Sequence, residues 1–224
     1  MKTRMTLLLT VVVGGIGLIS VQTPSLNAAQ AGDITALPSV AAKAMPMVGE
    51  EFQYVGSSKC KKCHIKQHKS WTKTKMANAM DTLKPGAASE AKQKFKLDAA
   101  KDYTQDESCL ACHTTGFGKP GGYAVPTPDD KESVKKAKKM AGIGCESCHG
   151  PGSAYIKVFE EIMKSKRTYM VDELYAVGLT KIDENTCTTC HNERGPTHDA
   201  TKPFDFAKQK EEDAHEHIPL KQRQ

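Results

Sequence analysis

The 224-residue sequence is poor in the residues that build an ordinary hydrophobic core. Only 38% of its residues are apolar and 6% are aromatic, and one apolar run near the N-terminus, Leu7 to Val21, holds many of the apolar ones. Eleven prolines and seventeen glycines interrupt the rest. Because a folded domain must bury apolar surface, something other than aliphatic side chains has to supply its interior.

The sequence also lacks the marks of a nucleic-acid-binding protein. Its formal net charge is +6, but it has no arginine-rich arm and no interleaving of basic and aromatic residues. Nucleic acid is therefore not an expected partner. The lysines of KCKKCHIKQHK and KESVKKAKKM are either solvated faces or a surface that attracts an acidic partner.

The N-terminus has the pattern of a secretory signal. Lys2 and Arg4 precede the apolar run, and Ala29-Gln30-Ala31 offers a cleavage site of small residues. Glycines interrupt the run, which is short for a membrane span. We expect residues 1–31 to be a cleaved signal peptide, with an uncleaved anchor as the alternative. This predicts an exported protein, periplasmic or extracellular, without a stable membrane span.

No cysteine stands alone, because all eight lie in four copies of the pattern C-x-x-C-H. Paired cysteines also occur in zinc sites and disulfides, but here a histidine follows every pair, although histidine is only 8 of 224 residues. This pattern attaches c-type haem: the thiols bind its vinyl groups and the imidazole becomes the proximal iron ligand. The sequence predicts four haems at the first to fourth motifs: Cys60, Cys63 and His64; Cys109, Cys112 and His113; Cys145, Cys148 and His149; and Cys187, Cys190 and His191.

Four covalent haems would provide the missing interior. We expect a mainly α fold with little β structure in which the haems form the core, preceded by an irregular arm (32–57) and comprising residues 58–224. Apolar periodicity and stop signals predict helices at 64–83, 88–96, 131–141, 153–166 and 205–217. The motifs recur at intervals of 49, 36 and 42 residues, so neighbouring haems should approach closely, which favours electron transport.

Several stretches outside the haem motifs are similar to a known family. SWTKTKMANAM, AKQKFKLDAAKDYTQDESCLACHTTGFGKPGGY, GIGCESCHGPG and the terminal HEH resemble the tetrahaem cytochrome c-554 family. The resemblance covers most of residues 58–152, weakens over 153–180 and returns around the fourth motif. It implies a haem-packed α fold, periplasmic electron transfer, and a five-coordinate second haem beside three haems with two axial ligands.

The resemblance also implies distal contacts. His215 matches the ligand of the fourth haem, with His217 as the alternative. The ligand position of the third haem falls on Met76, and that of the first haem falls near Phe159, which cannot bind iron. The wall of the second haem's open side is implied at Pro203 and Phe204.

Methionine can replace histidine as a distal ligand and raises the reduction potential. Met76 is therefore either a ligand or a core residue, with Met80 as its alternate. Met163 lies one helical turn after Phe159, so it could reach the first haem. The alternatives there are His198, or a vacant position with Met163 in the core. We expect His68 to be solvated or to contact a propionate.

These patterns predict a periplasmic electron-transfer protein, not an enzyme, that serves redox partner proteins by hopping along closely packed haems. Two other functions stay open. A five-coordinate haem could reduce nitric oxide or a similar small molecule, or the chain could be a subunit of an extracellular haem filament. The oligomeric state is not predicted.

Overall fold

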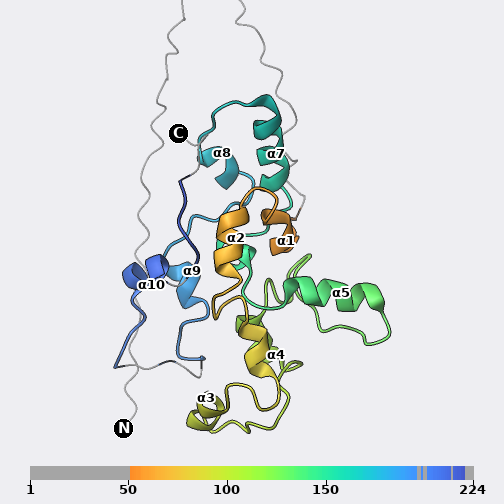
Figure 1. Cartoon of the computed structure of the whole chain (residues 1–224), viewed down its shortest axis with the longest axis vertical. Coiled ribbons are helices and arrows are strands. Elements are labelled where there is room, and N and C mark those ends of the chain that lie inside the picture. The colour runs from red at the N-terminus through yellow and green to blue at the C-terminus, as the bar shows by residue number, and fades with distance from the viewer. Residues whose placement is uncertain (1–50, 196–197, 199–200, 213, 220–224) are drawn as a thin grey trace, which may run out of the picture. The chain divides into compact units, whose positions relative to one another are not determined.

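The computed structural model describes residues 51–195, 198, 201–212 and 214–219, and the predicted signal peptide and most of the predicted arm lie outside them. Within the described residues the regular elements are helices, and β structure is limited to isolated bridge residues, such as the antiparallel bridge between Thr114 and Ala141. The prediction of a mainly α fold with little β structure is confirmed (Figure 1). Among these residues, no helix has both the length and the apolar character needed to cross a membrane.

The helices are short and are joined by turns. They are α1 (Ser57–Cys60), α2 (Ile65–Trp71), the 3-10 helix η1 (Ala79–Leu83), α3 (Ser89–Lys94), α4 (Glu107–His113), α5 (Lys131–Met140), α6 (Cys145–His149), α7 (Tyr155–Ser165), α8 (Asp172–Tyr175), α9 (Glu184–Thr188) and α10 (Phe206–Glu212). The predicted helices at 88–96, 131–141 and 153–166 correspond to α3, α5 and α7.

Aspartate side chains define the start of three helices. Asp106 accepts a hydrogen bond from the Ser108 backbone at 3.1 Å at the start of α4, and Asp130 caps α5 in the same way. At the start of α9, Asp183 accepts from the Thr186 backbone at 3.0 Å, in a capping box. Such side chains satisfy N–H groups that have no partner inside the helix. Two of these caps directly precede haem motifs, the second and the fourth.

The prediction of one helix over residues 64–83 is wrong. Helix α2 ends at Trp71, turns follow, and η1 begins at Ala79. The Thr74 hydroxyl donates to the Trp71 carbonyl at 2.8 Å, and the Asn78 amide donates to the Thr74 carbonyl at 2.8 Å. Short polar side chains that bond to nearby backbone compete with helix formation. Met76 therefore lies in a turn, not on one helical face with Met80.

The last predicted helix is also shorter than expected. Helix α10 ends at Glu212, so His215 lies beyond it. The segment that carries His215 is held by a long-range contact, because the Glu216 backbone donates to the Ser70 hydroxyl on α2 at 2.8 Å.

The hydrophobic interior of the described residues is divided into two small clusters. One packs around η1, α4 and α5, and the other around α7 and α8. Their buried members are Leu83, Tyr103, Leu110, Tyr123, Ala137 and Met140 in the first cluster, and Tyr155, Ile162, Tyr169, Leu174 and Val177 in the second. The few buried apolar residues thus form two small clusters and not one continuous core.

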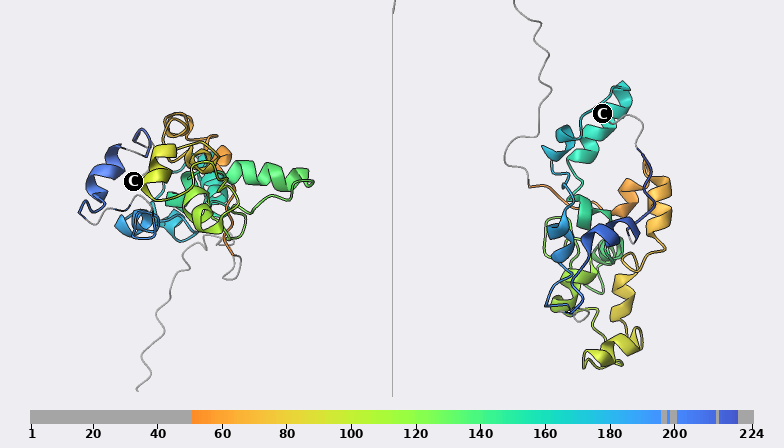
Figure 2. Two further views of the ribbon diagram at one scale, coloured as in Figure 1. Left: turned by 90° about the horizontal axis from the view of Figure 1, so that it is seen from below. Right: turned by 90° about the vertical axis from the view of Figure 1, so that its left-hand side faces the viewer.

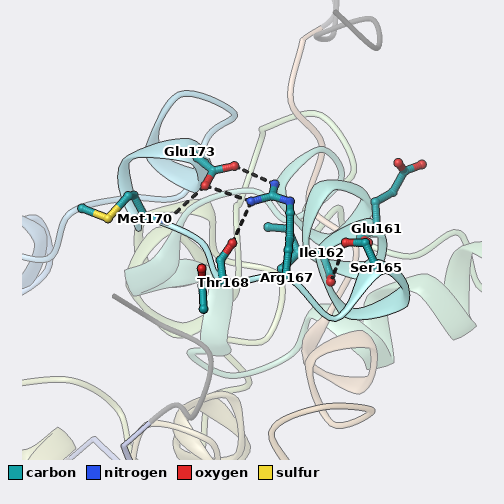
Figure 3. A network of polar contacts seen from close by, with 7 residues as sticks. All are labelled: Glu161, Ile162, Ser165, Arg167, Thr168, Met170 and Glu173. Carbon is teal, nitrogen blue, oxygen red and sulfur yellow. Dashed lines mark hydrogen bonds and ion pairs between the residues drawn. The ribbon is translucent and has the colours of Figure 1, made fainter. Parts of the chain in front are cut away.

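A polar network joins the end of α7 to the start of α8 (Figure 3). Arg167 binds both carboxylate oxygens of Glu173, at 3.1 and 2.6 Å, and also donates to the Thr168 carbonyl at 3.0 Å. The Met170 backbone donates to the same carboxylate at 3.0 Å. These bonds fix the turn between α7 and α8.

Residues 51–56, at the end of the predicted arm, are extended and packed against the domain. The Tyr54 backbone donates to the Pro120 carbonyl at 2.9 Å, and the Gln53 backbone donates to the Ser153 hydroxyl at 2.9 Å. Gly116 has φ +64°, and a Cβ there would lie 2.8 Å from the Tyr54 ring, so glycine is needed for this close approach. Helix α5 projects away from the neighbouring helices (Figures 1 and 2).

Candidate haem sites

Each C-x-x-C-H motif forms a single helical turn. The His64 N–H donates to the Cys60 carbonyl at 3.0 Å, and the His191 N–H donates to the Cys187 carbonyl at 3.0 Å. The second and third motifs lie within α4 and α6. Residues three and four apart share one helical face, so both thiols and the imidazole of a motif face the same side.

The thiols fit attachment to haem better than the other uses of paired cysteines. All eight are free; Cys63 is exposed and the others are half-buried. Within the described residues, no three histidine, cysteine or acidic side chains converge to hold a metal ion. Both hydrophobic clusters are built mainly from residues outside the motifs. The motifs therefore present ordered thiol pairs at partly open surfaces, as four large covalently attached apolar groups require.

His215 faces the histidine of the third motif. The ring centroids of His149 and His215 are 6.3 Å apart, and the ring planes differ by 20°. With metal–nitrogen bonds of about 2.0 Å, two imidazoles on opposite sides of one metal have centroids about 6.3 Å apart. The spacing matches a shared iron. The ring contact of His215 is thus with the third motif, where the Ser70 contact holds its segment beside α2. The expectation that His215 ligates the fourth haem stays a prediction.

The hydrogen bonds of these histidines also suit iron ligands. The Nδ1 atom of His215 lies 3.0 Å from the Glu216 carbonyl, and that of His113 lies 2.8 Å from the Ala79 carbonyl. Such bonds hold a proton on Nδ1 and leave Nε2 free to bind metal. Burial, and then the imidazoles of His215 and His64, lower the pKa of His149 to about 4, so this imidazole is neutral at pH 7.

Phe159 occupies the matching position opposite the first motif. Its ring centroid lies 6.3 Å from that of His64, with an angle of 27° between the planes. The phenyl ring has no lone pair to donate. Met163, one turn further along α7, is 40% exposed. The prediction that Met163 reaches the first iron stays a prediction.

Phe204 packs against the fourth motif, where its ring is 4.5 Å from that of His191. Its flat ring can stack on that imidazole. The expectation that Pro203 and Phe204 form the wall of the second site stays a prediction.

Met76 lies beside the segment that leads into the third motif. Its carbonyl accepts a hydrogen bond from the Ile143 backbone at 2.9 Å, and its side chain is half-buried. The ring of His215, and not the side chain of Met76, has a recorded contact with the imidazole of His149. A role for Met76 as a ligand stays a prediction.

The remaining histidines are not placed opposite a motif imidazole. His68 lies edge-on to Trp71 at 5.2 Å, and His198 is exposed. The Nε2 atom of His217 lies 3.1 Å from the Lys210 carbonyl. The expected roles of these three residues stay predictions.

Sequence reasoning missed two residues that organise the site. Glu146, between the cysteines of the third motif, is only 1% exposed. A charged residue between two attachment cysteines gives no signal of burial in the sequence. Ser70 was missed because its partner, Glu216, lies 146 positions away.

Comparisons with known proteins agree with this arrangement. The family model described as cytochrome c554 and c-prime matches residues 59–150. Cytochrome c-554 of Nitrosomonas europaea is 40% identical over 157 residues, which cover 67% of this chain and 63% of that protein. The chain thus spans less than two thirds of the length of that relative.

A solved structure gives the same result over a longer range. The reduced state of cytochrome c554 from Nitrosomonas europaea superposes with a TM-score of 0.66 at 35% identity, over 78% of this chain and 91% of the solved chain. The four motifs, the helical fold and these similarities show that the chain belongs to the cytochrome c-554 family, with covalently attached haem c as its cofactor.

Proposed function

We propose that this protein carries electrons between redox partner proteins in the periplasm, by hopping along four closely packed haems. The bound haems supply one-electron oxidation and reduction. The chain supplies their attachment, their spacing and their axial ligands. The observation that carries the proposal is the contact between cysteines of different motifs.

These contacts support a continuous order of motifs. Helix α1, which carries Cys60, packs against α6 of the third motif, where the Cys145 backbone donates to the Ser57 hydroxyl at 3.1 Å; the thiol of Cys145 also raises the pKa of Cys60. Burial, and then Cys187 of the fourth motif, raise the pKa of Cys148. Burial, and then Cys112 of the second motif, raise the pKa of Cys190, so these thiols are neighbours as well. We propose the order first, third, fourth, second for electron passage.

The axial ligands follow from the rings opposite the motif histidines. We propose that His64, His113, His149 and His191 are the proximal ligands, each next to its cysteine pair. His215 is the proposed distal ligand at His149, because of the 6.3 Å ring separation. Met76 and Met163 remain candidates for other distal positions.

The lysines of α5 are the proposed docking surface for an acidic partner. They line a groove formed by Pro128, Lys131, Val134, Lys135, Lys138 and Lys139. The helix ends beside two motifs, because the Met140 carbonyl accepts from the Thr115 backbone at 2.8 Å, just after the second motif, and α5 contacts α1, which carries Cys60. A partner held by these charges would lie near the first and second motifs.

One observation favours a second candidate function, the binding of a small molecule such as nitric oxide at the first motif. Phe159 stands opposite His64 and has no donor atom, so His64 would be the sole protein ligand at that iron if Met163 does not bind it. Absorption spectra of the reduced protein with carbon monoxide test this, and a shift is expected if the position opens. An unchanged spectrum would remove this function.

Stopped-flow oxidation of the fully reduced protein tests the carrier function. When the protein is mixed with an excess of one soluble one-electron acceptor, all four haems should be oxidised on the same timescale. A haem that stays reduced on this timescale would contradict a continuous order of motifs.

A further inference from the structure

Glu146 is a buried carboxylate that neither haem attachment nor iron ligation uses. It lies between Cys145 and Ser147 in the third motif and is 1% exposed. Burying an ionised carboxylate is costly unless it is paired or hydrogen-bonded. Its burial therefore calls for compensating contacts.

Backbone N–H groups provide those contacts. One carboxylate oxygen accepts from Val55 at 2.9 Å and from Gly152 at 2.7 Å, and the other accepts from Gly56 at 2.6 Å and from Val55 at 3.1 Å. No basic side chain among the described residues forms an ion pair with it. Four backbone N–H bonds, and no paired cation within that part of the chain, are the surroundings that suit a carboxylate anion.

The donors belong to two separate segments of the chain, one before the first motif and one after the third. Val55 and Gly56 lead directly into α1, which carries Cys60, whereas Gly152 follows the third motif. A second bond joins the same elements, because the Cys145 backbone donates to the Ser57 hydroxyl at 3.1 Å. The field of the carboxylate reaches its surroundings: burial, and then Glu146, raise the pKa of Tyr54.

We propose that Glu146 is a positioning residue that locks the first motif against the third and lowers the reduction potentials of the two haems attached there. A fixed negative charge in a poorly solvated site favours the oxidised, more positive form of a nearby iron. The haems of the first and third motifs would then lie near the charge, and those of the second and fourth motifs would lie remote from it. This inference rests on the proposed function only in treating those potentials as functionally important.

The Glu146→Gln variant removes the charge at nearly constant size. In a redox titration of the holoprotein followed by electron paramagnetic resonance, two haems should shift toward easier reduction. The expected change in their oxidised-to-reduced ratio at a given potential is tenfold or more, which equals 59 mV or more for a one-electron couple. The other two haems should change less than threefold.

Glu184→Gln is the matched control, because Glu184 precedes Cys187 in the fourth motif but is exposed. Solvent screens its charge, so all four ratios should stay within threefold of the wild type. Four haems with unchanged ratios in Glu146→Gln, or an equal shift of all four, would overturn the proposal.

Glu146→Asp keeps the inference testable if Glu146→Gln does not assemble. Mass spectrometry of the purified chain counts the attached haems. Four haems with near wild-type ratios in Glu146→Asp, beside incomplete loading in Glu146→Gln, would support a required charge. Failure of both variants to load would show that side-chain shape, not charge, is needed, and would overturn the proposal. The titration uses chemical mediators, so its outcome is independent of any physiological partner.

Discussion

Two motif histidines face an aromatic ring at a distance that would suit a shared iron. At His149 that ring is an imidazole, His215, and at His64 it is a phenyl ring, Phe159, at the same 6.3 Å centroid separation. The two sites thus have the same ring separation, but only the imidazole can donate an electron pair to iron. Two substitutions test this difference directly.

Phe159→His should supply a second imidazole to the first haem. Because the ring already lies at the required distance, we expect a new low-spin bis-histidine signal in the electron paramagnetic resonance spectrum of the oxidised protein. Phe159→Leu is the control, since it changes the ring without adding a donor. If Phe159→His and Phe159→Leu have the same spectrum, Phe159 does not face the iron.

His215→Ala should remove the distal ligand of the third haem. We expect one low-spin signal to be replaced by a high-spin signal, which exogenous imidazole should reverse. His217→Ala is the matched control, because its ring contacts the Lys210 carbonyl and is not opposite a motif histidine. Equal effects of the two variants would contradict the assignment.

At the scale of elements, capping aspartates hold the helical turns of the second and fourth motifs. Hydrogen bonds from the Ser108 side chain and backbone lower the pKa of Asp106 from its ordinary 3.8. A bond from the Thr186 backbone is the main stabilising contact that lowers the pKa of Asp183, although the exposed site is partly screened. The charged caps therefore stabilise the folded chain.

The caps predict acid sensitivity with a definite sign. Since both folded pKa values lie below the ordinary value, this stabilisation is present above about pH 4 and is lost as the pH falls through the lowered values. Circular dichroism between pH 6 and pH 2 should show a steeper loss of helix in the wild type than in the double variant Asp106→Asn, Asp183→Asn. Asparagine still caps but does not titrate. If both proteins lose helix equally as the pH falls, the charged caps do not stabilise the fold.

The elements also show what the sequence could and could not predict. Local signals identified the four haem motifs and placed α3, α5 and α7. They failed over residues 64–83, where the bonds of Thr74 and Asn78 interrupt an apolar pattern. They also gave no sign of the long-range bond between Glu216 and Ser70 that holds the segment of His215. Both failures arise where a contact outside the periodic pattern determines the path of the chain.

At the scale of the whole molecule, the basic groove of α5 should govern encounters with an acidic partner. Replacing Lys135, Lys138 and Lys139 by alanine should slow electron exchange with an acidic redox protein by about tenfold at low ionic strength. The rate should also depend less on salt, which stopped-flow measurements over a range of ionic strength would show.

The control for this prediction removes the same charge elsewhere. The exposed lysines Lys157, Lys164 and Lys181 replaced by alanine should leave the exchange rate nearly unchanged. An equal loss of rate in both triple variants would mean that net charge, and not the α5 surface, determines association.

The four-haem content also follows from the sequence alone, because the C-x-x-C-H pattern is specific and few other residues are available to form a core. The order of the haems does not follow from it, since the cysteine contacts join the first motif to the third and the second to the fourth, against their order in the chain. Only the folded chain brings these motifs together.

Protein-film voltammetry of the holoprotein tests the central claim that four connected haems carry electrons. We predict four reversible one-electron couples, all of which exchange electrons with the electrode. We predict no catalytic current when nitric oxide is added. Fewer than four couples in exchange with the electrode, or a sustained catalytic current with nitric oxide, would contradict the account.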